Sequence, residues 1–216
     1  MWITLSGIDG TGKNALKDRL EVYYGEKGYS IFNFKVPYHT WVKEMINLSG
    51  GGRSHGDPLT DELIFAASHR IESPMITTWK KKYDILISKR FWLDQFPYAE
   101  VKGLKWEEIR EITKTYELEK PDLMFFLDCD AECALERKNV YPHKYKYIEF
   151  IRPLRINFLR VMDLLKDKKL PELDNIPYFL IDAHKSLERV YEEIRDIIDS
   201  YIIEHNLQPK IIKEEK

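Results

Sequence analysis

A glycine-rich turn near the start of the chain constrains its fold more than any other feature. Residues 7–13 read Gly-Ile-Asp-Gly-Thr-Gly-Lys, which fits the pattern G-x-x-x-x-G-K. An apolar run, Trp2–Ser6, precedes this turn, and apolar residues at helical spacing follow it from Asn14. A strand, a glycine turn and a helix in this order predict a phosphate-binding loop, because glycines let backbone N–H groups turn inward and a helix N-terminus attracts anions.

Lys13 is the residue of this loop that we expect to reach the outer phosphates of a nucleotide. The other residues expected to hold the nucleotide here are Gly7, Ile8, Asp9, Gly10, Thr11, Gly12 and Asn14. The position after the lysine usually carries Ser or Thr, whose hydroxyl binds Mg²⁺. Its occupant, Asn14, offers a neutral amide oxygen that Mg²⁺ also accepts. Asn14 is therefore the candidate metal ligand, although its side chain differs in reach from a hydroxyl.

Short apolar runs alternate with longer helical patterns along the rest of the chain. We expect strands at Trp2–Ser6, 30–34, 84–88, Leu123–Asp128 and 178–181, and helices from Asn14 and over 61–73, 106–118 and 187–203. The last three strands are nearly continuous apolar runs, as in a parallel sheet that helices cover on both faces. The pattern predicts a doubly wound α/β fold of three layers around a five-stranded parallel sheet, in one domain spanning residues 1–216.

The charge balance excludes several classes of partner. Thirty-four basic residues and thirty-six acidic residues leave a net charge of −2, and no basic stripe suggests nucleic-acid binding. No apolar run approaches the roughly 20 residues of a membrane span, and no secretory leader is recognisable, so we expect a cytoplasmic protein without a membrane partner. Cys129 and Cys133 form neither a CxxC motif nor a disulfide framework, and we expect two small buried side chains.

Three segments interrupt the alternation of strands and helices. Residues 49–54 are glycine-rich and predict a surface loop, and residues 210–216 read as a solvated tail. A basic, aromatic and proline-interrupted stretch follows the helix after the fourth strand. We expect this stretch, at about 138–147, to be a lid over a bound nucleotide.

Several segments taken together resemble the thymidylate kinases. They are ITLSGIDGTGK at 3–13, LIFAASHR at 63–70, ISKRF at 87–91, PDL at 121–123, FLD at 126–128, ALER at 134–137, IDA at 181–183 and SLE at 186–188. The resemblance covers nearly the whole chain. It implies the P-loop NTPase type of α/β fold, ATP-dependent phosphorylation of dTMP to dTDP with Mg²⁺ as cofactor, and a homodimer.

The resemblance also implies roles for individual residues. Lys13 and the loop amides would hold the ATP phosphates, Asp9 would face the sugar of the acceptor nucleotide, and Arg90 would contact the phosphates in transit. These three residues are the catalytic candidates. Arg137 would stack against adenine, and lysines within 138–146 would close over the donor.

The same resemblance implies an acceptor site made of aromatic and polar side chains. Phe65 would stack on the thymine ring, and an arginine one helical turn later would bond the base at O4. Ungapped counting places His69 at that position and Arg70 beside it, so both stay candidates. Tyr98 would line the acceptor pocket.

The chain departs from the family pattern at two further places. Lys89 stands where the family usually has Asp before the arginine, which removes a carboxylate from the expected metal surroundings. Asp128 is an alternative carboxylate, or else a turn or capping residue. Val36-Pro37-Tyr38 replaces a Glu-Pro or Pro-Glu pair, and Lys35 is then a candidate for the acceptor phosphate.

These departures leave two alternative functions open. One is a kinase for another deoxynucleotide or for a nucleoside. The other is a catalytically weakened homologue that binds nucleotides without transferring phosphoryl groups. A GTPase or helicase is not expected, because the chain lacks an N-K-x-D pattern and a clear Walker-B strand end.

Overall fold

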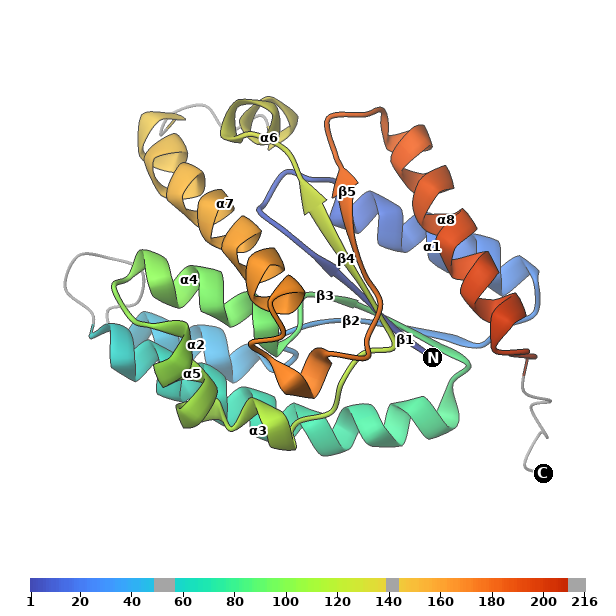
Figure 1. Ribbon diagram of the computed structural model, residues 1–216, viewed down its shortest axis with the longest axis horizontal. Helices are drawn as coiled ribbons and strands as arrows, with labels where there is room; N and C mark the ends of the chain where they lie inside the picture. Colours follow the sequence, from blue (N-terminus) through green and yellow to red (C-terminus); the bar gives the residue numbers. More distant parts are fainter. Residues whose placement is uncertain (49–56, 139–143, 210–216) are drawn as a thin grey trace.

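The computed structural model describes residues 1–48, 57–138 and 144–209 (Figure 1). Its centre is a five-stranded, all-parallel sheet in the order β2-β3-β1-β4-β5. The strands are β1 (Trp2–Ser6), β2 (Ile31–Lys35), β3 (Ile85–Lys89), β4 (Leu123–Asp128) and β5 (Tyr178–Asp182). Each expected strand is confirmed to within one residue at either end.

Helices cover both faces of this sheet, which confirms the doubly wound, three-layer α/β arrangement (Figure 1). On one face lie α1 (Lys13–Glu26) and α8 (Leu187–Glu204). On the other face lie α3 (Pro58–Lys82), α4 (Gln95–Val101), α5 (Trp106–Thr113) and α7 (Lys144–Lys166). The remaining elements described are α2 (Thr40–Leu48), α6 (Ala131–Lys138) and the short 3₁₀ turns η1 (Trp92–Asp94), η2 (Thr115–Glu117) and η3 (Pro171–Leu173).

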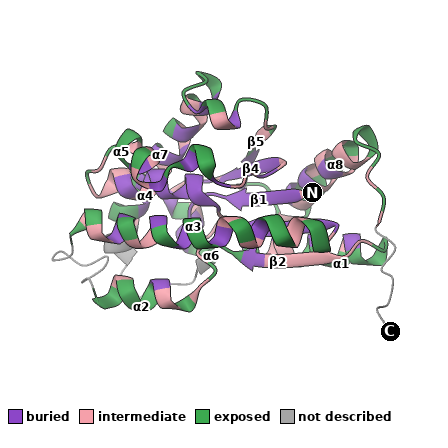
Figure 2. Cartoon of the chain, turned by 90° about the horizontal axis from the view of Figure 1, so that it is seen from below, coloured by how far each residue is buried: buried purple, intermediate pink, exposed green. Residues whose placement is uncertain are grey.

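The central strand β1 and its neighbour β4 are the most completely buried strands of the sheet. All five residues of β1 and the first five of β4 are buried, and Figure 2 shows β1 as a buried strand between helices with exposed outer sides. The buried Trp2 indole still finds a partner, since its Nε1–H donates to Ser88 Oγ at 2.9 Å. Burial on both faces explains why these strands read as apolar runs without alternation.

Two expected helices end elsewhere in the structure. The helix expected over 61–73 continues past Pro74 to Lys82. Its last turns are held by Trp79, which packs on the aromatic side chains of β2, with 4.7 Å between the ring centroids of Trp79 and Phe32. The helix expected over 106–118 stops at Thr113, where Lys114 takes a left-handed conformation with φ of 50°. Helix α6 is the helix expected after the fourth strand, whereas α2, α4 and α7 were not predicted from the sequence.

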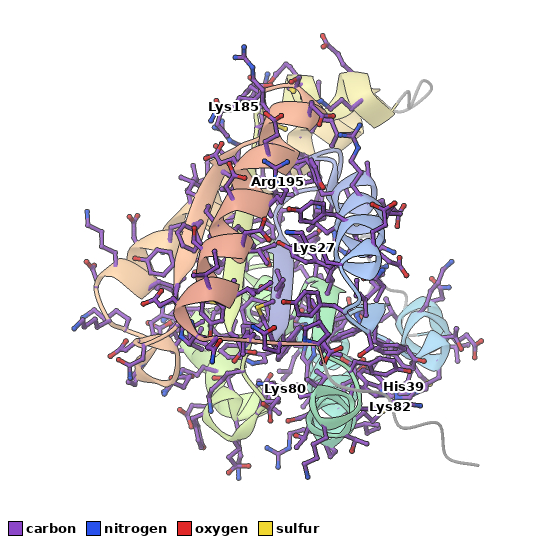
Figure 3. All side chains as sticks on the ribbon, turned by 90° about the vertical axis from the view of Figure 1, so that its right-hand side faces the viewer. Lys27, His39, Lys80, Lys82, Lys185 and Arg195 are labelled. Carbon is purple, nitrogen blue, oxygen red and sulfur yellow. The ribbon has the colours of Figure 1, made fainter. Side chains whose placement is uncertain are left out.

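Helices α1 and α8 are held together by edge-to-face tyrosine rings and by cations that lie over those rings. Lys27 Nζ lies 4.2 Å from the centre of the Tyr23 ring, and the Arg195 guanidinium lies 5.8 Å from the same ring (Figure 3). Asp199 of α8 accepts from the Tyr23 hydroxyl at 2.8 Å. Attractions of this kind anchor α1, and the start of α1 is the segment that follows the phosphate loop.

Three sequence expectations concern segments that the structure leaves partly undescribed. The glycine-rich loop at 49–54, the tail at 210–216 and residues 139–143 of the expected lid lie outside the described residues. The expected lid begins at the last residue of α6, and its last four residues, 144–147, belong to the first turn of α7. Cys129 is buried and Cys133 is partly buried, both as free thiols. Among the described helices, none combines the length and the apolar character that crossing a membrane requires.

Candidate active site

The carboxyl ends of the central strands bring the candidate residues together, as expected for an open parallel sheet. Lys89 at the end of β3 pairs with Leu5 of β1, so Arg90 and the loop after β1 are neighbours. Two cavities open at this edge, one of about 460 Å³ and one of about 390 Å³. Arg90 lines both of them.

The larger one, the phosphate cavity, is polar and the smaller one, the aromatic cavity, is mostly apolar. The phosphate cavity is lined by Asp9, Gly10, Gly12, Lys13, Asn14, Ala15, Lys35, Lys89, Arg90 and Arg137. The aromatic cavity is lined by Val36, Pro37, Ile46, Asp61, Phe65, His69, Arg90, Phe91, Asp94, Gln95, Tyr98, Lys102 and Phe150.

The loop after β1 needs glycine at two positions because its backbone passes close to other backbone. Gly7 has φ of 122° and Gly10 has φ of 95°. A Cβ on Gly7 would lie 2.3 Å from the carbonyl oxygen of Leu127, and one on Gly10 would lie 2.3 Å from that of Ala134. The glycines of the motif therefore let the loop run tightly between β4 and α6.

Lys13 is folded into this loop and is almost completely buried. Its ammonium donates to the carbonyl oxygens of Gly7 at 2.9 Å and Ile8 at 2.6 Å, and to Thr11 Oγ1 at 3.2 Å. Burial, and next the charge of Arg90, lower the pKa of Lys13 to about 7. An anion bound in the cavity would favour the charged form again, which is the arrangement expected of a phosphate-binding lysine.

Positive charge dominates the lining of the phosphate cavity. Among the described lining residues, five are cationic and one, Asp9, is a carboxylate. Arg137 is fixed at the rim, where it donates to the carbonyl oxygens of Ala183 at 2.6 Å and Lys185 at 3.3 Å. Burial and the neighbouring Arg90 lower the pKa of Lys35. A phosphate chain entering this cavity would relieve the repulsion among its cations.

Arg90 joins the two cavities in a strained backbone conformation. Its φ of 69° is in the left-handed region, which non-glycine residues rarely adopt outside functional or turn positions. One guanidinium nitrogen donates both to Asp9 Oδ1 at 2.8 Å and to the Tyr98 hydroxyl at 2.6 Å. Burial alone would lower the pKa of Arg90, but Tyr98 and Asp9 outweigh it and raise that pKa. The catalytic candidates Asp9, Lys13 and Arg90 thus meet around one cavity.

The aromatic cavity brings together Phe65, His69 and Tyr98 from the acceptor candidates. His69 Nε2 lies 2.9 Å from Gln95 Oε1. Because the Gln95 amide nitrogen donates to Glu62, its oxygen accepts, and His69 Nε2 carries the hydrogen. Arg70 lies outside this cavity, half-exposed and paired with Glu117 at 2.6 Å. Of the two adjacent candidates, only His69 reaches the cavity.

Buried charged groups support the floor of the aromatic cavity. Lys102 donates to Asp61 at 2.9 Å and to Glu62 at 3.4 Å. Burial raises the pKa of Glu62 against the opposing pull of Gln95 and Lys102. A connected set of this kind holds side chains such as Gln95 in one orientation.

The surroundings of Asn14 do not fit a protein-bound divalent metal ion. Its amide oxygen accepts a hydrogen bond from the Lys89 ammonium, and the one carboxylate in the described cavity lining, Asp9, is paired with Arg90. Asp128, the alternative carboxylate, forms a two-bond ion pair with Arg155 at 2.7 and 2.8 Å. Within residues 1–48, 57–138 and 144–209, no three Asp, Glu, His or Cys side chains are arranged to hold a metal.

Several lining residues of the aromatic cavity escaped sequence reasoning, among them Asp94, Gln95, Lys102 and Phe150. Asp94 Oδ2 accepts from Ser6 Oγ at 2.6 Å and from the Phe91 N–H at 3.1 Å. Its position four residues after Arg90 was a usable signal, since a polar residue there sits on the same turn. Phe150 had no such signal, because α7 reaches the cavity only through packing.

Comparison with known proteins agrees with this geometry. The thymidylate kinase family model matches residues 5–194. The chain is 27% identical over 207 residues to a probable thymidylate kinase of Staphylothermus marinus, covering 94% of this chain and 96% of that one. It is 29% identical to a probable thymidylate kinase of Methanosphaera stadtmanae and 26% identical to a thymidylate kinase of Thermosipho africanus, covering in both cases 94% of this chain and 99% of the relative. The chain belongs to the thymidylate kinase family.

Proposed function

We propose that this chain transfers the terminal phosphoryl group of ATP to dTMP, giving dTDP and ADP. The observation that carries the proposal is that Arg90 lines both cavities, so that one guanidinium can touch the phosphates of both nucleotides. Membership of the thymidylate kinase family supports the reaction, and relatives of that name match the chain over most of its length.

The reaction needs positioning and positive charge more than it needs a general base. The phosphate of a nucleoside monophosphate is already anionic at neutral pH, so its oxygen attacks the γ-phosphorus while the bond to the β–γ bridging oxygen breaks. In this proposal Lys13 neutralises charge on the donor phosphates and Arg90 neutralises it on the group in transit. Arg137 lies against adenine, and a lid at about 138–147 closes over the donor and keeps out water.

The aromatic cavity is the proposed site of dTMP. Phe65 stacks on the thymine ring, and Gln95, oriented by its bonds to His69 and Glu62, offers the second hydrogen of its amide nitrogen to the base edge that carries O4. Tyr98 lines the sugar, and Lys35 and Arg90 hold the acceptor phosphate. Asp9 contributes by orienting Arg90, to which it is bonded at 2.8 Å.

The surroundings of Asn14 leave no step of this mechanism to a metal ion that the protein itself holds. Its amide oxygen is already engaged by Lys89. Mg²⁺, implied by the family, is therefore not assigned to Asn14 here, and the transferred group is neutralised by side-chain cations.

We also propose a homodimer. Helix α3 leaves the apolar side chains of Leu59, Leu63 and Ile71 exposed by 41%, 52% and 45%, and a second copy packed on this helix would cover them. Sedimentation velocity should give a species of twice the 25.8 kDa chain mass. A single 25.8 kDa species at micromolar concentration would contradict this part of the proposal.

A coupled assay of ADP release tests the reaction itself. The acceptors to compare are dTMP, dUMP, dCMP, dGMP and thymidine, each with ATP as donor. We expect dTMP among the best acceptors. Preference for another acceptor would support the kinase of different specificity. ATP binding by calorimetry without ADP release from any acceptor would support the catalytically weakened homologue.

A further inference from the structure

Two positions at which the chain differs from its family pattern contact each other. Asn14 and Lys89 lie 75 residues apart in sequence, and the Lys89 ammonium donates to Asn14 Oδ1. The contact follows from the sheet, because Lys89 pairs with Leu5 of β1 and therefore ends β3 beside the start of α1. Both side chains line the phosphate cavity.

Each difference removes part of a metal site, and together they install a cation. A hydroxyl after the loop lysine and a carboxylate before Arg90 would offer Mg²⁺ the hard oxygen ligands it prefers. Here the oxygen of Asn14 already accepts a hydrogen bond from the Lys89 ammonium. Lys89 is also the residue that stands in place of the family's carboxylate. A divalent ion on the same oxygen would lie beside Lys89, with twice the repulsion of two unit charges.

Other acidic side chains near the phosphate cavity do not restore the missing ligand. Asp9 is paired with Arg90. Asp94 lines the aromatic cavity instead: its Oδ2 accepts from Ser6 and the Phe91 N–H, and its buried Oδ1 has no hydrogen-bond partner among the described residues. The described lining of the phosphate cavity therefore takes its positive charge from side chains alone.

We infer that Lys89, held by Asn14, supplies at the donor phosphates the positive charge that a protein-bound divalent ion would supply, so that nucleotide binding by this chain does not depend on a divalent metal. This inference rests on the proposed ATP site. Lys89 is suited to the role because most of the charged groups around it are cations, namely Lys35, Lys17 and Arg90, with Asp18 as the opposing carboxylate. Burial, and next Lys35 and Lys17, lower the pKa of Lys89, and an anionic ligand reverses that repulsion.

Calorimetric titration with ADP, in excess MgCl₂ and in excess EDTA, tests the inference without turnover. For the unmodified protein we expect the two Kd values to agree within about threefold, which by linkage means that the metal binds the protein–ADP complex no better than it binds free ADP. The Asn14→Ser, Lys89→Asp double variant rebuilds the oxygen ligands. We expect its Kd in EDTA to be at least about tenfold weaker than in MgCl₂.

Two single variants complete the comparison. Lys89→Met removes the cation without adding a ligand, and we expect it to weaken ADP binding in both buffers. Lys120→Ala is the matched control, because it removes one charge at the opposite edge of the sheet, where Lys120 donates to the Tyr116 carbonyl. We expect its ratio of Kd values to equal that of the unmodified protein.

The outcomes separate this inference from the proposed function. An unmodified protein that binds ADP tightly only with MgCl₂ overturns the inference and leaves the donor site standing. A folded protein that binds no ADP in either buffer overturns the proposed function as well.

If the double variant fails to fold, the two Kd values of the unmodified protein still decide the question, and electron paramagnetic resonance of Mn²⁺ gives a second measurement. We expect the protein–ADP complex to bind no more Mn²⁺ than ADP alone, and tighter binding contradicts the inference.

Discussion

The two cavities that meet at Arg90 are built by different means. The phosphate cavity is organised by one continuous loop, whose backbone is pressed between β4 and α6 at Gly7 and Gly10. The aromatic cavity is lined by side chains from the turn after β2 and from helices α2, α3, α4 and α7. These segments are far apart in the sequence. One cavity is therefore a property of local backbone, and the other a property of packing.

This difference has a consequence for how each cavity tolerates change. A substitution in the loop disturbs the backbone that binds any nucleotide phosphate. A substitution in the aromatic cavity changes which base fits and leaves the phosphate site in place. Damage to one cavity should therefore change the KM of one nucleotide much more than the KM of the other, whatever it does to kcat, with Arg90 as the exception because it lines both cavities.

The largest effect is expected from Lys13→Ala. Loss of a charge that stabilises mainly the transition state should lower kcat roughly 10²- to 10³-fold, with the KM for dTMP changed less than about threefold because the aromatic cavity is untouched. Steady-state kinetics of ADP release measures both. Lys17→Ala, one turn further along α1 and paired with Asp18, is the control. An unchanged kcat in Lys13→Ala would refute the assignment of the phosphate cavity.

The substitution Phe65→Ala should change binding in the aromatic cavity and leave the phosphate cavity unaffected. Base stacking on an aromatic ring contributes about 1–3 kcal/mol, so the KM for dTMP should rise roughly ten- to a hundredfold while the KM for ATP stays the same. The variant Phe65→Tyr keeps the ring and should retain most of the affinity. Equal increases in both KM values would mean that the cavities are not independent.

The adjacent residues His69 and Arg70 sharpen the comparison on a finer scale. His69→Ala removes a hydrogen-bonding group from the cavity and should lower kcat/KM for dTMP about tenfold, within the usual range for one buried hydrogen bond. Arg70→Ala removes a half-exposed pair with Glu117 and should change it less than about twofold. The reverse order would show that the helix presents a different face to the base.

The smallest effect, a change in thermal stability, is expected from a substitution at His184, which lies between the two residues whose carbonyl groups accept from Arg137. Hydrogen bonds to Asp130 and Asp182 raise the pKa of His184, so its contribution to stability is full below the ordinary histidine pKa and is lost as the pH rises through the raised value. The Cys133 N–H, and next the His184 ring, lower the pKa of Asp130, while the backbone N–H and then the ring of His184 lower the pKa of Asp182, so the contribution of these carboxylates is lost in acid.

Thermal melts of His184→Gln across pH test this reasoning. The Tm deficit should be largest between about pH 5 and 6.5, and should stay within about 2 °C because the pair is exposed. His205→Gln, at a site where the ring contacts the Tyr201 carbonyl rather than a carboxylate, is the control. A deficit that grows in alkaline solution would contradict the sign.

Sequence patterns predicted the sheet and the phosphate loop closely. The five strands lie within one residue of their expected ends, because short apolar runs bounded by turn residues are typical of buried strands. The loop was predictable because its residues are contiguous and its glycines are required by the local backbone. The family resemblance added Phe65, Arg90 and Arg137, each of which lines one of the two cavities or both.

Other features depended on contacts between distant segments. The sequence left His69 and Arg70 equivalent, and only the packing of α3 turns His69 toward Gln95 and Arg70 toward Glu117. It treated Asn14 and Lys89 as two separate irregularities, and the pairing of β1 with β3 makes them one contact.

The sequence by itself therefore determined the layered parallel sheet and the tight glycine loop after β1, because both are encoded by residues that are neighbours along the chain. The tertiary structure alone decided which side chains enter the aromatic cavity and which cation stands beside Asn14. Those outcomes depend on strand order and on helix rotation, and both are set by burial of the whole core rather than by any one segment.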